Sequence, residues 1–365
     1  MKKKVLIVGP TPPPYNGMSV VTKNILNSKA FNDEFEVLHL DTADRRSVEN
    51  IGNLDIINIF LALKHFFEFV WILLLKNPEI IYIPISQNFL GYLRDSLFLI
   101  PAKIFRKKII VHLHGGYFKY FYENTIFLNK ILIKYTLSTI EKAIVLGECL
   151  REHFKPFINE NKIFVVPNGV EDKYGNNIID KDSFDVLFLS NLNHEKGVFR
   201  FLDLAKDIIG THPNIRFICA GEWQSVDDNK KAVEFCRTYF LERNIIFTGR
   251  VSGKTKDELI LKSSIFCMPT QYKFEGQPLV ILEAMSAGLP IIAMDKGCIK
   301  ETVVDKENGY IFNIFEQEKM RLKILSLYEN KDLYSRFSKN SKDIFYNKFT
   351  KKIFIKNLIN VMRGV

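Results

Sequence analysis

The sequence predicts an α/β protein that consists of two doubly wound units. Three observations support this prediction. Short β-rich runs alternate with helical stretches, the alternation resumes after a polar segment near the middle of the chain, and 365 residues suffice for two hydrophobic cores. Strands that are separated by helices pair in parallel, so each unit should have one parallel sheet with helices on both faces.

The predicted strands fall into two groups on either side of a linker. The first group lies in residues 4–9, 35–40, 80–85, 108–115, 142–147 and 162–169, and the second in 185–190, 215–221, 245–249, 264–269 and 290–295. The polar segment 170–183 between them is rich in charge, Gly and Asn, as linkers are. We therefore expect one domain at 1–170 and a second at 171–340. The amphipathic, basic residues 341–365 are expected to form a C-terminal helix that packs back on the first domain.

Composition excludes several classes of protein. The chain is 47% hydrophobic and 25% charged, as is ordinary for a soluble globular protein, and its five cysteines are scattered without a CxxC motif. Neither a disulfide framework nor a zinc site is indicated, which favours the reduced cytoplasm. The apolar run 5–8 is too short for a signal peptide, and the longest unbroken apolar run, 69–75, is too short to span a bilayer.

The charge balance bears on the partners of the chain. A net charge of +10 suits anionic ligands or an anionic membrane surface, with peripheral association at the inner face of the cytoplasmic membrane as the expected form. No nucleic-acid motif accompanies the charge, so we do not expect nucleic acid as a partner.

Functional residues are expected in the loops that follow the strands, because ligands of open α/β sheets bind at the carboxyl ends of the strands. After the first strand, Gly17 starts a predicted helix and could let a ligand approach main-chain N–H groups; it could equally be a turn residue. No GxGxxG motif is present, so a nicotinamide cofactor is not expected.

The strand at 108–115 carries two histidines on one face, His112 and His114. We expect His112 to be packed in the core and His114, which precedes two glycines, to contact a ligand. The aromatic and basic run that follows could pack under the domain, or it could face an acceptor or a membrane. Its residues are Tyr117, Phe118, Lys119 and Tyr120.

The strand at 185–190 leads into Lys196 and Gly197 just before a predicted helix. A lysine at such a turn is well placed to contact a diphosphate. The segment 273–290 contains a short, almost wholly apolar helix, which Pro278 should begin as the first helical residue. Main-chain N–H groups near Gly276, Gln277 and Leu279 should then point at an anion.

Two acidic residues belong to the same segment. Glu283 lies within the apolar helix and therefore needs a cleft or a partner that makes its burial tolerable. Glu275 precedes the helix, eight residues earlier, so the two carboxylates should contact different parts of one ligand.

This pattern resembles the family-4 retaining glycosyltransferases of the GT-B fold, which have two Rossmann-like domains facing across a cleft. The resemblance is carried by Glu275 and Glu283 in an E-x7-E motif, and by "HEKG", "VVPNGV", "FTGRV" and "ENGYIF" in the expected order. It implies a metal-independent, retaining hexosyltransferase without a cofactor. Such an enzyme moves a sugar from a UDP- or GDP-sugar to a glycan or lipid-linked acceptor in bacterial capsule, lipopolysaccharide O-antigen or exopolysaccharide biosynthesis.

The resemblance also implies roles for individual residues. Glu283 would bind the ribose hydroxyls, Glu275 the transferred sugar, and Lys196 with the N–H groups of residues 276–279 the diphosphate. His114 would lie near the donor sugar. The catalytic residues would be His114, Lys196 and Glu275, and the donor site would comprise Gly17, Asn191, Lys196, Arg250, Val251, Glu275, Gly276, Gln277, Pro278, Leu279 and Glu283.

One departure from the family pattern concerns leaving-group stabilisation. Asn191 stands where the family commonly has an arginine, which puts more weight on Lys196 and the helix dipole. The DxD string at 180–182 lies in the linker and is interpreted as a solvated charge run, so no metal is expected. Two alternatives remain: a sugar-nucleotide epimerase or hydrolase, and a non-catalytic sugar-nucleotide-binding subunit of a glycan assembly complex.

Overall fold

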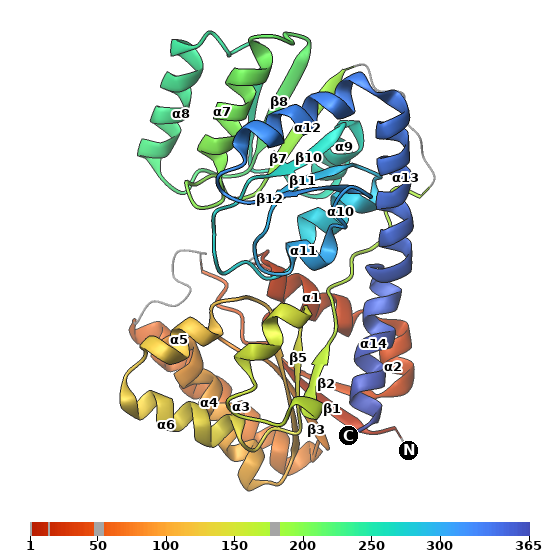
Figure 1. Cartoon of the computed structure of the whole chain (residues 1–365). Helices are drawn as coiled ribbons and strands as arrows, with labels where there is room; N and C mark the ends of the chain where they lie inside the picture. Colours follow the sequence, from red (N-terminus) through yellow and green to blue (C-terminus); the bar gives the residue numbers. More distant parts are fainter. Residues whose placement is uncertain (1, 14, 47–54, 176–182) are drawn as a thin grey trace. The chain divides into compact units, whose positions relative to one another are not determined.

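The computed structural model describes residues 2–13, 15–46, 55–175 and 183–365. The chain forms two compact units (Figure 1). The first consists of Met1–Asn168 together with Lys351–Val365, and the second of Gly169–Thr350. The predicted pair of doubly wound α/β units is confirmed.

The first unit is built on a parallel six-stranded sheet in the order β2-β1-β3-β4-β5-β6. The four inner strands consist mostly of buried residues, as expected for a sheet that is covered on both faces, whereas the two edge strands have one buried residue each. The strands are β1 (Lys4–Val8), β2 (Glu36–Leu40), β3 (Ile80–Pro84), β4 (Lys108–Leu113), β5 (Lys142–Val145) and β6 (Ile163–Val165).

Helices cover both faces of this sheet. One face packs on α1 (Gly17–Leu26), α2 (Lys29–Glu34) and α14 (Lys351–Arg363), which share one apolar core with alternate strand residues. Right-handed crossovers place α3 (Ile56–Lys76), α4 (Phe89–Ile104) and α6 (Phe127–Leu137) on the opposite face. The short α5 (Phe118–Asn124) and the 3₁₀ turns η2 (Glu148–His153) and η3 (Glu160–Lys162) complete the unit.

The second unit repeats the architecture with a parallel sheet in the order β12-β11-β10-β7-β8-β9. Its strands are β7 (Phe184–Leu189), β8 (Ile215–Ala220), β9 (Ile245–Gly249), β10 (Ile265–Met268), β11 (Ile291–Met294) and β12 (Gly309–Phe312). The strand β12 was not among the predicted strands. Its helices are α7 (Val198–Ile209), α8 (Val226–Thr238), α9 (Gly253–Lys262), α10 (Leu279–Ser286), α11 (Ile299–Thr302), α12 (Gln317–Glu329) and α13 (Lys331–Lys348).

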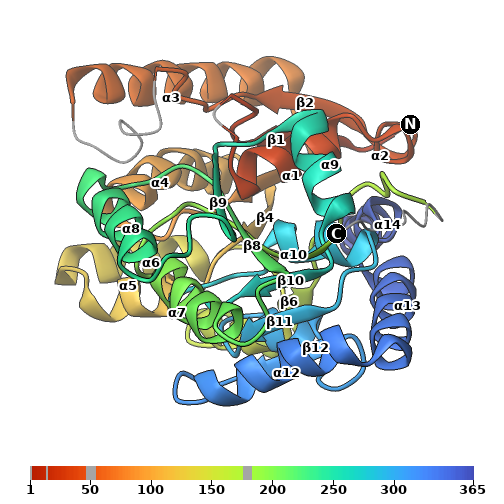
Figure 2. The same cartoon turned by 90° about the horizontal axis from the view of Figure 1, so that it is seen from above.

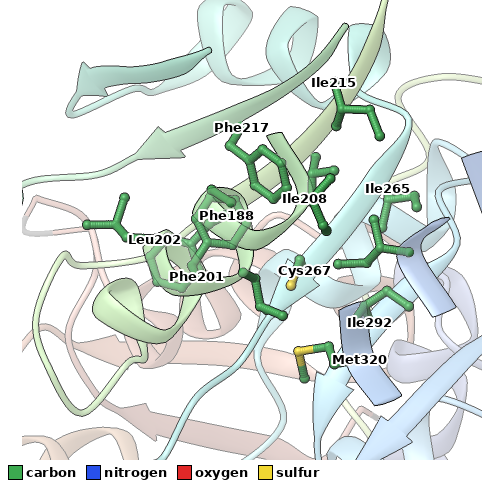
Figure 3. Close-up of a cluster of buried hydrophobic side chains, with 14 of the residues drawn as sticks. Phe188, Phe201, Leu202, Ile208, Ile215, Phe217, Ile265, Cys267, Ile292 and Met320 are labelled. Carbon is green, nitrogen blue, oxygen red and sulfur yellow. The ribbon is translucent and has the colours of Figure 1, made fainter. Parts of the chain in front are cut away.

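Two apolar layers hold the second sheet in place. Phe188 and Phe217 of the sheet pack against Phe201 of α7, with ring centroids 5.4 and 5.3 Å from that ring (Figure 3). On the other face, residues of α9, α10 and α13 pack against the same strands. Because α10 belongs to a fully buried layer, the loop before it is anchored by the core.

The domain limits differ in detail from the predicted ones. The first unit ends at Asn168 rather than 170, and the chain returns to it at Lys351 rather than at 341, because the end of α13 still packs on the second unit. In the first unit, α14 is attached by an ion pair between Arg363 and Glu34 and by a 2.8 Å hydrogen bond from Lys142 Nζ to the carbonyl oxygen of Val361.

Candidate active site

The loops after the neighbouring strands β7 and β10 bring Lys196 and Glu275 together. The chain leaves β7 through β8 and β9 and returns to β10 on the other side of β7, so these loops flank the topological switch point of the sheet. Lys196 Nζ lies 2.6 Å from Glu275 Oε1, and Thr270 Oγ1 donates to the same oxygen over 3.0 Å. Glu275 is only 6% exposed. The pairing of these two residues and the contact with Thr270 were not anticipated from the sequence.

Two glycines allow these loops to pack against one another. Gly197 has φ = +90°, and a Cβ there would lie 2.1 Å from the carbonyl oxygen of Pro269. Gly297, in the loop after β11, has φ = +51°, and a Cβ there would lie 2.0 Å from the carbonyl oxygen of Glu275. Cys298 N–H also donates to the carbonyl oxygen of Gly276 over 2.9 Å. The position of Glu275 is therefore fixed by close main-chain contacts.

The start of α10 differs from the prediction by one residue. Pro278 has ψ = 122°, an extended value, so it is the cap that precedes the helix and Leu279 is the first helical residue. Within the described parts of the chain, no hydrogen bond uses the main-chain N–H of Gly276, Leu279 or Val280. These donors at the positive end of a helix dipole can receive an anion. Gln277, by contrast, directs its side chain to Thr302 Oγ1 at 2.9 Å.

Glu283 has a protein partner that the sequence did not reveal. Its Oε1 lies 2.6 Å from Lys256 Nζ, which comes from α9. The Glu283 and Lys256 side chains are 17% and 22% exposed. The second oxygen, Oε2, is buried and has no hydrogen-bond partner among the described residues. A carboxylate with one oxygen fixed and the other unsatisfied can accept hydrogen bonds from a ligand that enters the site.

The other predicted donor-site residues lie at the same edge of the second sheet. Arg250 follows β9 and its Nη1 lies 3.8 Å from Glu222 Oε2, with both side chains well exposed. Val251 packs at the border of the buried layer. Asn191 is exposed after β7; the loop itself is held by Asn193, whose Oδ1 accepts the N–H of Lys196 over 2.7 Å.

His112 and His114 lie in the first unit at the end of β4. His112 is fully buried, and its Nδ1 is hydrogen-bonded to the Tyr82 hydroxyl at 2.6 Å, so it is packed in the core as predicted. The His114 ring stacks on it at 4.0 Å between centroids, and His114 Nε2 is buried without a partner among the described residues. Burial lowers the pKa of His114 to about 4 and holds that of His112 well below its ordinary value.

Gly17 is the first residue of α1, after the cap residue Asn16. Asn16 Oδ1 accepts the N–H of Ser19 over 2.9 Å, and Ser19 Oγ accepts the N–H of Asn16 in return. A Cβ added to Gly17 would meet no atom of the chain's described residues within 4 Å, and its φ is not left-handed. Neither packing nor turn geometry therefore requires a glycine here.

The aromatic run after His114 is divided between core and surface. Phe118 is 0% exposed and stacks on Phe154 at 5.6 Å, so its predicted place on the acceptor or membrane side is wrong. Tyr120 is exposed, with the Tyr117 ring 5.2 Å away. Lys119 is exposed near Glu152, with its Nζ 3.4 Å from the Glu152 Oε2 atom.

Metal ligands do not cluster in the described parts of the chain: no group of three or more His, Cys, Asp or Glu side chains is placed to hold a metal ion there. The DxD string at 180–182 lies outside the described residues.

Comparison with known proteins finds a family match in the second unit. Residues 169–344, which lie in the second unit, match the family described as glycosyl transferases group 1. An uncharacterized glycosyltransferase of Haemophilus influenzae is 28% identical over 219 residues, which are 59% of this chain and 60% of that protein. The chain spans about half the length of several of the curated relatives that it matches.

Solved structures extend the similarity to the fold of the whole chain. HepE of Anabaena, determined in complex with UDP, has a TM-score of 0.79 at 17% identity and covers 99% of this chain and 100% of its own. The lipopolysaccharide outer core galactosyltransferase WaaB has a TM-score of 0.71 at 17% identity, with 99% of each chain covered. The predicted GT-B fold is confirmed.

Proposed function

We propose that this chain, whose residues 169–344 match the glycosyl transferases group 1 family, is a retaining glycosyltransferase that uses a nucleoside diphosphate sugar as donor. The observation that carries the proposal is the state of Glu283, whose Oε1 is held by Lys256 while the buried Oε2 has no partner among the described residues. Two vicinal hydroxyls of a ribose can donate to such a carboxylate and satisfy it. The family match is consistent with this assignment.

The donor diphosphate is assigned to the start of α10. The N–H groups of Gly276 and Leu279 and the positive end of the helix dipole supply donors, and Lys196 supplies a cation from the neighbouring loop. Because a lysine ammonium has three protons, Lys196 can keep its bond to Glu275 while it donates to a phosphate oxygen. Glu275 would thereby lie between the diphosphate and the transferred sugar, and its carboxylate would accept hydrogen bonds from the hydroxyls of that sugar.

The chemical step follows from this arrangement. The bond between the sugar and the diphosphate ionises while Lys196 and the main-chain donors stabilise the departing charge. The acceptor hydroxyl attacks from the face that the diphosphate leaves and gives its proton to the departing phosphate oxygen. The configuration at the anomeric carbon is retained. We assign this stabilisation to the protein without a metal ion. Asn191 contributes no charge, so Lys196 carries a larger share than in relatives with arginine at that position.

Residues of both units complete the proposal. For Gly17 we keep the role that the resemblance implies, close approach of the N-terminal loop to the donor sugar, since its own unit does not require a glycine at this position. His114, neutral at physiological pH because its pKa is about 4, offers an uncharged hydrogen-bonding group near the sugar. Arg250 and Val251 border the nucleobase.

The acceptor is proposed to be a glycan or lipid-linked glycan of bacterial capsule, O-antigen or exopolysaccharide biosynthesis. WaaB, which has the same fold, is described as a lipopolysaccharide outer core galactosyltransferase. Free cysteines throughout the described chain suit the cytoplasm, where such donors are made, and we place the protein at the inner face of the cytoplasmic membrane.

A donor screen tests the assignment. UDP- and GDP-sugars should raise the melting temperature in proportion to their affinity, and the best of them should be consumed when an acceptor is present. An isomerised or hydrolysed donor without acceptor would indicate the epimerase or hydrolase instead, and binding without turnover would indicate a non-catalytic subunit. The proposal is wrong if no nucleoside diphosphate sugar binds.

A further inference from the structure

Helix α3 of the first unit is apolar on its solvent-exposed face as well as on the face that packs against the unit. A helix that only covers a sheet would have a polar outer face. The buried stripe consists of His65, Phe69 and Leu73, spaced four residues apart, and Phe69 packs on Phe98 of α4 at 5.2 Å between ring centroids. At 100° per residue, the opposite face is apolar along its whole length and exposed to solvent. It consists of Ile56, Phe60, Leu63, Phe67, Trp71 and Leu74.

Exposed apolar side chains also occur on the neighbouring helices α4 and α6. Helix α4 packs against both α3 and α6, and α3 runs along the outside of the unit (Figure 2). The surface, called the α3 face below, includes further exposed residues: Phe89, Leu93, Phe127, Leu128, Ile131 and Tyr135. An exposed apolar area that runs over three helices marks an interaction site.

The topology shows that α3 cannot cross a bilayer. By length and composition alone, α3 is the only helix among the described residues that could do so. The helix is continuous through Lys64, His65 and Glu68, which interrupt the apolar run in the sequence. However, α3 connects β2 to β3, and both strands pair with β1 in one sheet. A spanning α3 would place β2 and β3 on opposite sides of the membrane, which their shared pairing with β1 forbids.

The charges that accompany the α3 face distinguish lipid from protein as its partner. The three helices carry six basic residues, Lys64, Lys76, Arg94, Lys103, Lys130 and Lys134, against two acidic ones, Glu68 and Asp95. Lys64 pairs with Glu68 and Arg94 with the buried Asp95, which leaves the other four lysines as the excess positive charge. Lysine is depleted in protein interfaces, whereas lysines beside an apolar helix face are typical of helices that bind anionic lipid. Lys103 Nζ lies 3.6 Å from the centroid of the Tyr135 ring, so basic and aromatic groups are mixed within the surface.

We propose that the α3 face docks on an anionic lipid bilayer, with α3 lying in the plane of the interface and its outward aromatic residues inserted among the lipids. This inference rests on the membrane localisation proposed above and not on the catalytic assignment. It replaces the aromatic run after His114 as the membrane-binding element, because Phe118 of that run is buried in the core.

Flotation with vesicles of phosphatidylglycerol and phosphatidylcholine tests the proposal on the full chain. The wild type should float at low salt and partly at high salt, since salt screens the lysines but not apolar insertion. Phe67→Glu combined with Trp71→Glu should lower the bound fraction at least about tenfold. The matched control, Phe240→Glu combined with Phe315→Glu, changes aromatic residues of the second unit that are 88% and 93% exposed and should float like the wild type.

Tryptophan fluorescence supplies a second readout of the same surface. The chain has two tryptophans, so Trp223→Phe leaves Trp71 as the single reporter, and its emission should shift to the blue on addition of anionic vesicles. The proposal is overturned if the wild type fails to float at both salt concentrations, or if the α3 variant floats like the control. It is also overturned if the α3 face holds two copies together, which sedimentation would show as a dimer that the α3 variant dissociates without vesicles.

Nucleotide titration of the same proteins separates the two proposals. If the α3 variant loses flotation and keeps the nucleotide affinity of the wild type, the substitutions affect membrane docking and leave the donor site intact. Flotation without any nucleotide binding would refute the catalytic assignment and leave docking supported.

Discussion

Lys256→Met tests the donor site most sharply, because it removes the charge while keeping an unbranched side chain of similar length. Lys256 Nζ lies 2.6 Å from Glu283 Oε1, and about four fifths of each side chain is buried. Two unit charges about 4 Å apart attract each other by about 4 kcal/mol at an effective dielectric constant of about 20. Partial solvation of the remaining carboxylate reduces the loss, so we expect the free energy of unfolding to fall by about 2–3 kcal/mol.

The same substitution should weaken donor binding. Without Lys256 the Glu283 carboxylate loses its fixed orientation, and we expect the Kd for the nucleoside diphosphate to rise about tenfold, or about 1.4 kcal/mol. The kcat should change little, because the ribose contact is the same in the ground state and the transition state. Urea unfolding and calorimetric titration measure the two effects, and Lys256→Arg should restore both. Tighter binding by Lys256→Met would refute the reasoning, since Lys256 would then compete with the ribose for Glu283.

Three further predictions concern the loops and the histidines. Gly297→Ala should lower the free energy of unfolding by about 2 kcal/mol or more, since φ is +51° and the carbonyl oxygen of Glu275 occupies the place of a Cβ. Gly17→Ala should leave the melting temperature unchanged and reduce turnover. Equal effects of the two variants on the melting temperature would contradict this reasoning. Lys196→Ala should lower kcat by roughly a hundred- to thousandfold with a smaller effect on KM, and an unchanged kcat would remove Lys196 from leaving-group stabilisation. The pKa of His114 and of His153 is lowered from 6.5 to about 4, so the unfolded chain binds protons in this pH range that the folded chain does not bind. The free energy of unfolding should therefore fall by about 3 kcal/mol per histidine between pH 6.5 and 4. Urea unfolding of His153→Gln should show a shallower decline with falling pH, and an unchanged decline would argue against His153.

The fold could be predicted because its signals are local. Each strand of the first unit is a short, largely apolar run with turn residues or helices on either side. Parallel pairing of the strands follows from the alternation of strands and helices along the chain. The β12 strand, Gly309–Phe312, was missed because its apolar residues follow directly on the polar stretch at 305–308, without a separate strand signal. The extent of the C-terminal return was misplaced because α13 and α14 are both basic and amphipathic, and only packing decides which unit each one joins.

The residues of the candidate site could be identified in part, because some of their signals are also local. Glu283 stands out as a carboxylate in an apolar helix, and Lys196 and Glu275 follow strands that the sequence identifies. Lys256 could not be found, because it lies on another helix, 27 residues before Glu283 in the sequence, and resembles any surface lysine. The Lys196–Glu275 pair depends on the order in which β7 and β10 lie side by side, which local sequence does not encode.

The apolar segment at 60–76 illustrates the converse. Charged residues interrupt it in the sequence, and its longest unbroken apolar run, 69–75, is too short to span a bilayer. On the helix, Lys64 and Glu68 lie at one border of the exposed face, with Lys64 Nζ 3.7 Å from Glu68 Oε1, so the aromatic residues form an unbroken stripe. The helical spacing of these apolar residues can be seen in the sequence, but only the structure shows which face of the helix packs on the unit and which is exposed.

The central claim is that Glu283 recognises a ribose. The direct measurement is calorimetric titration of the nucleoside diphosphate that binds best and of its 2′-deoxy form, to the wild type and to the variant that combines Glu283→Leu with Lys256→Met. We expect the missing hydroxyl to cost the wild type roughly tenfold or more in affinity and the neutral double variant almost nothing. An equal loss in both proteins would show that the ribose lies elsewhere and would contradict the account.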